Sequence, residues 1–107
     1  MTIKRIWHGY TTPQRADDYE ALLQAEVIRE IEGKNIPGFQ QIEVLRRPIG
    51  DEVEFITIME FENLDSVRAF VGKDYEAAYV PAEARAVLKR FDERSQHYDL
   101  RDARHYT

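Results

Sequence analysis

Three side chains in the sequence could take up or hold a proton in a buried site: His8, His97 and Tyr79. An imidazole changes its charge near neutral pH, so either histidine could act as a general base. Tyr79 lies in a short irregular stretch that follows Gly72, where a phenol could reach inward. The alternative for each histidine is a structural hydrogen bond at a strand end or a subunit seam, and both interpretations stay open.

Four further aromatic side chains could form the wall of an apolar pocket beside Tyr79. A gap between a sheet and its helices is a usual place for a small-molecule site. The alternative is that these rings belong to the hydrophobic core, which applies most strongly to Phe55 and Phe70. The four expected substrate-binding residues are Trp7, Tyr19, Phe55 and Phe70.

The composition excludes several kinds of site. The chain has no cysteine, which removes disulfides, thiolate catalysis and cysteine-ligated zinc. No carboxylate–histidine spacing is typical of a metal site, and no glycine-rich phosphate loop is present. We therefore expect no metal and no cofactor.

Length and charge narrow the class of protein. With 107 residues the chain is expected to form a single domain, residues 1–107. The formal net charge of −5 would repel a phosphate backbone, so nucleic acid is not an expected partner. No apolar run is long enough for a signal peptide or a membrane span. We expect a cytoplasmic protein that has no membrane partner.

The most informative element is a strand predicted over residues 51–61, because it is apolar on both faces. Side chains alternate along a strand, so Phe55 and Met59 share one face, while Ile56 and Ile58 share the other. Such a strand needs a cover on both sides. A first strand is predicted over residues 3–10, and another over 39–47 is joined to 51–61 by a hairpin turn. The register of that hairpin, which would set Phe55 against Leu45 or, after a slip, Val44, stays open.

Helical periodicity fills the remaining segments. A helix is predicted over residues 13–32, with Thr12 as N-cap and Gly33 as its end. A second helix over 64–71 follows the N-cap Asn63, and a third is predicted over 81–91 after Pro81. A last strand is expected over 94–100, with an exposed tail over 101–107.

This order, β-α-β-β-α-β, is typical of a ferredoxin-like α+β fold, in which a four-stranded antiparallel sheet carries its helices on one face. The other face would then expose an apolar patch, and such patches usually mark an interface. We expect a second copy of the chain to cover it, so that two sheets form a dimeric α+β barrel. The expected patch residues are Ile6, Ile42, Val44, Ile56 and Ile58.

Six segments spread over nearly the whole chain resemble the antibiotic biosynthesis monooxygenase domain family, within the dimeric α+β barrel superfamily. They are 6–9 (IWHG), 17–23 (DDYEALL), 36–39 (IPGF), 53–57 (VEFIT), 66–72 (SVRAFVG) and 90–98 (RFDERSQHY). The resemblance implies oxidation of a small aromatic phenol or quinol by molecular oxygen without metal or flavin. On that basis His97 or His8 would manage protons, and Tyr79 would hydrogen-bond the substrate.

Two other functions stay open. Relatives in the superfamily degrade haem, which they hold through a histidine on the second helical region. Residues 63–91 contain no histidine here, which argues against haem. The remaining alternative is a non-catalytic dimeric module that binds a small apolar ligand. A pocket without an inward-pointing histidine or tyrosine hydroxyl would favour binding, and converging polar groups would favour catalysis.

Overall fold

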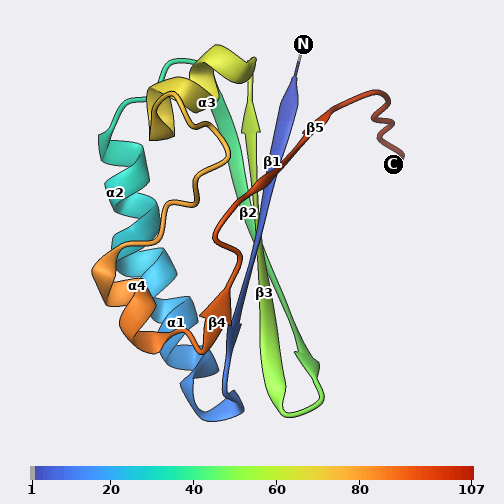
Figure 1. Ribbon diagram of the computed structural model, residues 1–107. Helices are drawn as coiled ribbons and strands as arrows, with labels where there is room; N and C mark the ends of the chain where they lie inside the picture. The colour runs from blue at the N-terminus through green and yellow to red at the C-terminus, as the bar shows by residue number, and fades with distance from the viewer. Residues whose placement is uncertain (1) are drawn as a thin grey trace.

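The computed structural model describes residues 2–107 and confirms the ferredoxin-like architecture (Figure 1). The strands are β1 (Ile3–Thr11), β2 (Phe39–Ile49), β3 (Glu52–Phe61), β4 (Arg90–Phe91) and β5 (Gln96–Asp99). All pairings are antiparallel, in the order β2-β3-β1-β4, and β5 also pairs with β1. Because β4 and β5 follow one another along β1, the sheet has four strand positions, as predicted, with an interrupted edge strand.

The helices lie on one face of the sheet. They are α1 (Ala16–Leu22), α2 (Ile28–Gly33), α3 (Leu64–Val71) and α4 (Ala82–Val87). In Figure 1 all four stand on the same side of the strands, and no helix of residues 2–107 covers the opposite side. No helix in this part of the chain is long and apolar enough to span a membrane.

The helix predicted over residues 13–32 exists, but it is not uniform. It begins with the 3-10 turn η1 (Pro13–Arg15), continues through α1, passes through the π-helical segment η2 (Leu23–Val27) and ends with α2. Thr12 precedes Pro13 in extended conformation, but its side chain makes no capping hydrogen bond, so the predicted cap was wrong in that respect. Asn63 does cap α3, because its side chain accepts a hydrogen bond of 3.0 Å from the Ser66 amide.

A β-bulge changes which side of β2 faces the helices. The pairing with β3 shifts between Phe39 and Gln41, which inserts one extra residue. Beyond the shift, Ile42 lies opposite Met59, and the side chains of such a pair share one face of the sheet. Val44 lies opposite Thr57 on the same, helix-covered face.

The predicted membership of the open patch was therefore wrong for Ile42 and Val44. Leu45 takes their place, because it lies opposite Ile56 on the uncovered face. Phe55 lies opposite Arg46, so the observed register is neither of the two considered from the sequence.

The third helix is shorter than predicted. α4 ends at Val87, and Leu88 is already extended. The Lys89 amide donates to the Tyr10 carbonyl at 2.8 Å, and Arg90 and Phe91 form β4 against β1. Phe91 fits the apolar period of the predicted helix, but an apolar residue in a short strand can do so by chance. Pairing with the free edge of β1 makes Arg90 and Phe91 a strand.

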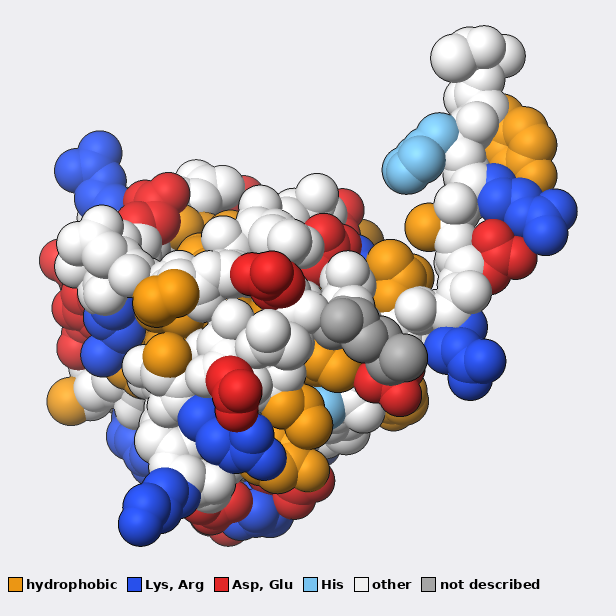
Figure 2. All heavy atoms as spheres, turned by 90° about the horizontal axis from the view of Figure 1, so that it is seen from above, with side chains coloured by type: hydrophobic (Ala, Val, Ile, Leu, Met, Phe, Trp, Pro, Cys, Tyr) orange, Lys and Arg blue, Asp and Glu red, His pale blue; other side chains and the backbone are white. Residues whose placement is uncertain are grey.

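The C-terminal segment leaves the body of the molecule. The Leu100 amide still donates to the Thr2 carbonyl at 2.9 Å. Residues 101–107 are then exposed and stand away from the body as an arm, which both overall views show (Figures 1 and 2). This agrees with the predicted tail.

The core lies between the sheet and the helices. Its largest fully buried side chains include Tyr19, Phe55, Phe61 and Val67. The ring of Tyr19 meets the ring of Phe55 edge-on, with centroids 4.9 Å apart. This contact fixes α1 against β3 and so sets the spacing between the two layers.

Candidate functional site: a small cavity with a buried arginine

A small cavity lies between the sheet and the helical layer, with a volume of about 40 Å³. Its floor contains side chains from β1, β2 and β3, and its roof comes from the helical segment 16–33 and the chain from Tyr79 to Ala84. Most of its lining is apolar or aromatic. Apart from the aromatic residues, three lining residues have polar side chains: Arg5, Thr57 and Ser95.

The size of the cavity limits which ligands it can hold. Pockets for drug-sized ligands measure roughly 300–1,000 Å³, whereas a single buried water needs roughly 10–15 Å³. The observed space of about 40 Å³ therefore suits only very small molecules. An aromatic ligand needs more room than this space offers.

One part of that roof has unusual backbone geometry. The π-helical segment η2 places Leu23 and Val27 on the cavity wall, and Ile28 and Ile31 of α2 continue it. The Ile28 amide donates to the Leu23 carbonyl, which is the wide i→i+5 pattern. π-segments inside α-helices are rare and frequently occur at functional sites. Here the segment brings successive apolar side chains onto one wall.

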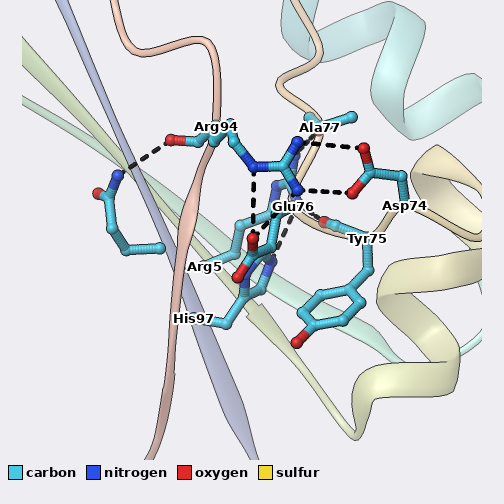
Figure 3. Close-up of polar contacts among 8 residues, drawn as sticks. Arg5, Asp74, Tyr75, Glu76, Ala77, Arg94 and His97 are labelled. Atoms are coloured by element: carbon cyan, nitrogen blue, oxygen red, sulfur yellow. Dashed lines mark hydrogen bonds and ion pairs between the residues drawn. The ribbon is translucent and has the colours of Figure 1, made fainter.

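Arg5 is a buried cation on the cavity floor. The residue is only 3% exposed, and burial lowers the pKa of its guanidinium to about 10, so it stays charged at neutral pH. It donates to the Tyr75 carbonyl at 2.6 Å, to the Ala77 carbonyl at 2.7 Å and to His97 Nε2 at 2.9 Å (Figure 3). Its guanidinium carbon lies 5.4 Å from the ring centroid of Phe70.

His97 is held as a neutral acceptor behind Arg5. A guanidinium can only donate, so Nε2 carries the lone pair and the proton sits on Nδ1. Burial, together with the positive charge of Arg5, lowers the pKa of His97 to about 4. Its Nδ1 is buried without a hydrogen-bond partner among the described residues. The imidazole packs edge-on against Tyr75, with centroids 5.1 Å apart.

A surface ion cluster fastens the chain that covers Arg5. Arg94 lies 2.7 Å from a carboxylate oxygen of Asp74 and 3.1 Å from one of Glu76. Figure 3 shows these three side chains beside Arg5 and His97, with Tyr75 and Ala77 on the same stretch of chain. The Arg94 side chain is 55% exposed, so each pair contributes little alone. Together they hold residues 74–77 against the chain that enters β5.

Four of the residues predicted for a pocket line this cavity: Trp7, Tyr19, Phe70 and Tyr79. Phe55 does not line it, because its ring is fully buried against Tyr19. The sequence had left a core position for Phe55 as the alternative, and its packing agrees with that alternative.

Of the three residues predicted for proton chemistry, the two histidines do not line the cavity, whereas the ring of Tyr79 does. Tyr79 contributes its ring to the wall, but its hydroxyl donates to Glu30 at 3.3 Å on the exposed side of the molecule. His97 contacts Arg5 and does not line the cavity. His8 lies on the opposite face of the sheet, paired with Ile56 across the strands. The Nδ1 of His8 lies 2.8 Å from an Asp92 carboxylate oxygen. Of the three residues, only His97 therefore contacts a charged group of the cavity, the guanidinium of Arg5.

Sequence reasoning missed Arg5 and Ser95. For Arg5 a signal was present, because it alternates with Ile3 and Trp7 on a strand face that is otherwise apolar. A charge at the centre of such a face must be paired or functional. Ser95 gave no comparable signal, since it precedes β5 in a polar stretch.

The fold has clear relatives among solved structures, although the sequence matches no protein-family model and no curated protein. A candidate antibiotic biosynthesis monooxygenase from Bacillus cereus superposes with a TM-score of 0.68 at 10% identity, covering 100% of this chain and 98% of that one. SnoaB, a cofactor-independent oxygenase from Streptomyces nogalater, gives 0.60 at 15% identity, with 95% of each chain covered. Rv0793 from Mycobacterium tuberculosis gives 0.60 at 15%, covering 96% of this chain and 98% of that one.

These structures cover nearly the whole chain in both directions, so the similarity extends to the complete architecture. The chain has the α+β fold of antibiotic biosynthesis monooxygenase-type proteins, as the resemblance in its sequence had implied. The fold can host many chemistries, so the reaction must be argued from the cavity.

Proposed function

We propose that this protein is a monooxygenase-like enzyme that oxidises a small aromatic phenol or quinol with molecular oxygen, without a metal or organic cofactor. The observation that carries the proposal is a cavity walled by Trp7, Tyr19, Phe70 and Tyr79, at the sheet–helix interface of a fold shared with a cofactor-independent oxygenase. The aromatic wall would hold a flat, electron-rich ring and exclude water.

In this reaction the substrate itself supplies the electrons. A phenol oxidised to a quinone takes one oxygen atom from O₂, and the second atom leaves as water together with two hydrogens of the substrate. The protein then has to bind the ring, exclude bulk water and stabilise negative charge on the phenol oxygen. The buried guanidinium of Arg5 is the positive charge available on the floor of the cavity.

A dimeric binding module for a small apolar ligand is the second candidate. The observation that favours it is the position of the three histidines of the chain, none of which lines the cavity within residues 2–107. The hydroxyl of Tyr79 also points to Glu30 rather than inward. Arg5 and Ser95 support the enzyme instead, because both place a polar group on the wall.

Oxygen consumption measured against a panel of phenols and quinols separates the two functions. The enzyme should consume oxygen with at least one compound and release the corresponding quinone, identified by mass spectrometry. A binding module should shift the melting temperature with some of these compounds and consume no oxygen with any of them. That second result would overturn the proposed reaction.

A substitution that fills the cavity links the reaction to this site. Ala84 is 2% exposed and lines the roof, so Ala84→Val places two additional methyl groups close to the space of about 40 Å³. We expect turnover to fall roughly tenfold or more, while the free energy of unfolding falls by no more than about 1–3 kcal/mol, the usual cost of extra methyl groups in a packed interior. Ala86→Val is the matched control, because Ala86 is exposed on the same helix, α4. Equal turnover in the two variants would place the reaction elsewhere.

We further propose that two copies of the chain pair through the open sheet face. Leu45 and Ile49 on this face are 49% and 40% exposed, and the less exposed Ile6, Ile56 and Ile58 lie between them and β5. An apolar surface of this kind normally has a partner. Light scattering after size exclusion should give twice the chain mass at micromolar concentration, and a monomer mass would contradict the proposal.

A further inference from the structure

Arg5 differs from the other arginines of the chain in both burial and partners. It is the only arginine among residues 2–107 in the buried class. Arg46, Arg47, Arg90 and Arg94 all pair with carboxylates near the surface. Arg5 forms no ion pair with a carboxylate of the described residues, and its lowered pKa arises from burial alone. A buried charge of this kind is costly unless an opposite charge joins it.

The hydrogen bonds of Arg5 leave part of its guanidinium free. A guanidinium has five N–H donors, and three are used by the carbonyls of Tyr75 and Ala77 and by His97 Nε2. The other two have no partner among residues 2–107. All three partners are neutral, so they orient the group and do not cancel its charge.

Ser95 supplies an independent observation on the same wall. It is 3% exposed, it lines the cavity with Arg5, and its Oγ has no hydrogen-bond partner in the described part of the chain. A buried hydroxyl without a partner is uncommon and usually marks a site that another molecule completes. The cavity thus carries a charged donor and a neutral donor in an otherwise largely apolar lining.

We propose that Arg5 and Ser95 form a subsite for an anionic oxygen of the ligand, a phenolate or a carboxylate carried on an apolar body. The two free N–H groups of Arg5 and the hydroxyl of Ser95 would donate to that oxygen. Charge-assisted hydrogen bonds to a guanidinium are among the strongest that proteins make, and the apolar wall strengthens them further. The ligand would then complete the ion pair that the chain lacks.

An anion subsite also decides where the proton of a phenol goes. This subsite rests on the proposed function in one respect, that the cavity is where the ligand binds. A site that stabilises the anion binds a phenol in its ionised form, so the proton goes to water before or during binding. No histidine then needs to reach the substrate, which fits the positions of His8 and His97 outside the cavity.

Matched ligands test the charge preference on the unmodified protein. Benzoate and benzamide have nearly the same shape, so making room for the ligand costs the same for both. We expect benzoate to bind roughly tenfold to hundredfold more tightly at neutral pH, measured by calorimetry. Equal affinities, or no binding of either compound, would overturn the proposal.

A chromogenic phenol separates the two sources of the anionic oxygen. The phenolate of para-nitrophenol absorbs visible light, so its absorbance reports ionisation directly. If the subsite accepts phenolates, the bound compound should titrate at a lower pH than the free compound. If benzoate binds selectively and para-nitrophenol shows no such shift, the subsite belongs to carboxylates. A shift to higher pH would contradict an anion subsite.

Two substitutions assign the effect to the named residues. Arg5→Gln should abolish the preference for benzoate, and Arg104→Gln is its control, because it removes the same charge on the exposed arm. Since Arg5 also holds the Tyr75 and Ala77 carbonyls, its loss could unfold the chain. Ser95→Ala avoids this problem and should weaken benzoate binding several-fold while leaving benzamide binding unchanged. Unchanged binding of benzoate to Ser95→Ala would remove Ser95 from the subsite.

These outcomes are independent of the oxygen chemistry. Selective benzoate binding with no oxygen consumption would keep the subsite and overturn the enzyme. Oxygen consumption with equal affinity for benzoate and benzamide would keep the enzyme and overturn the subsite.

Discussion

The open face of the sheet and the cavity on its covered face treat charge in opposite ways. On the open face, Lys4 pairs with Glu60 at 2.6 Å, and Arg47 pairs with Glu54 at 2.6 Å. In the cavity, the charge of Arg5 meets carbonyls, a neutral imidazole and the ring of Phe70, but no carboxylate of residues 2–107. Lys4 and Arg5 are adjacent residues of the same strand, β1.

This difference separates a surface suited to docking from a site suited to binding. Charges that are already paired can approach a partner surface without a new counter-ion, so the open face fits a second copy of the chain. A buried charge that lacks a counter-ion gains most from an anionic ligand. Alternation along single strands thus places the two proposed functions, dimer pairing and ligand binding, on opposite faces of one sheet. The following predictions test each face.

The largest expected effect is on the covered face, at Phe55. This residue is 0% exposed and supports Tyr19 beneath the cavity without lining it. Phe55→Ala should lower the free energy of unfolding by roughly 3–5 kcal/mol, the usual cost of removing a buried phenyl ring. Urea denaturation measures this value. A small loss of stability with a large loss of ligand affinity would instead make Phe55 a binding residue.

The next effect concerns the open face. Ile58 lies opposite Ile6, within the proposed dimer surface. Ile58→Asp would bury an unpaired carboxylate between two sheets, which should weaken dimerisation by roughly 2–5 kcal/mol. Analytical ultracentrifugation across a concentration series gives the dissociation constant.

Its control is Gln24→Asp, which adds the same charge on the exposed outer surface of the helical layer. We expect that variant to dimerise like the unmodified chain. Equal dissociation constants for the two variants would mean that the open face is not the dimer surface.

The sequence predicted most of the fold because its signals are local. A run of β-forming residues that is apolar on both faces identified β3, and helical spacing with a cap at Asn63 identified α3. The assignment of Ile42 and Val44 failed because a bulge near Gln41 shifts the pairing, and no residue type announces that shift. The helix predicted to Phe91 failed because β1 offered a free edge to Arg90 and Phe91.

The site was less predictable than the fold, because it depends on relations between distant residues. The aromatic wall followed from composition and layer order, and Trp7, Tyr19, Phe70 and Tyr79 lie where that reasoning placed them. The polar part did not follow, since Arg5 acquires its role from Tyr75, Ala77 and His97, which are 70 or more positions away. The roles of His8, His97 and Tyr79 in proton chemistry stay predictions.

An intermediate effect should appear in the pH dependence of stability, through His97 on the covered face. Burial and Arg5 lower its pKa from 6.5 to about 4 in the folded chain. Between these values the unfolded chain binds more protons, so stability falls as the pH drops from 6.5 toward 4. After allowance for the partial exposure of the ring, we expect His97 to account for roughly 1–2 kcal/mol of that fall.

His97→Gln tests this assignment, because a glutamine oxygen can still accept the hydrogen bond from Arg5. The variant should lose less stability than the unmodified chain over the same pH interval, measured by urea denaturation at each pH. Parallel pH profiles would show that another group causes the acid sensitivity.

The smallest expected effect belongs to the ion pair between Lys4 and Glu60 on the open face. In the single chain the side chain of Lys4 is 24% exposed and that of Glu60 is 22% exposed, so water still screens the pair. A double-mutant cycle with Lys4→Met and Glu60→Gln should give a coupling free energy of about 0.2–1 kcal/mol.

The cycle should be measured in the Ile58→Asp background as well as in the unmodified chain. If the second copy covers this pair, the coupling should be larger in the unmodified chain, because a partner removes the remaining water. Identical values in both backgrounds would place the pair outside the dimer surface and confine docking to the part of the face around Ile56 and Leu45.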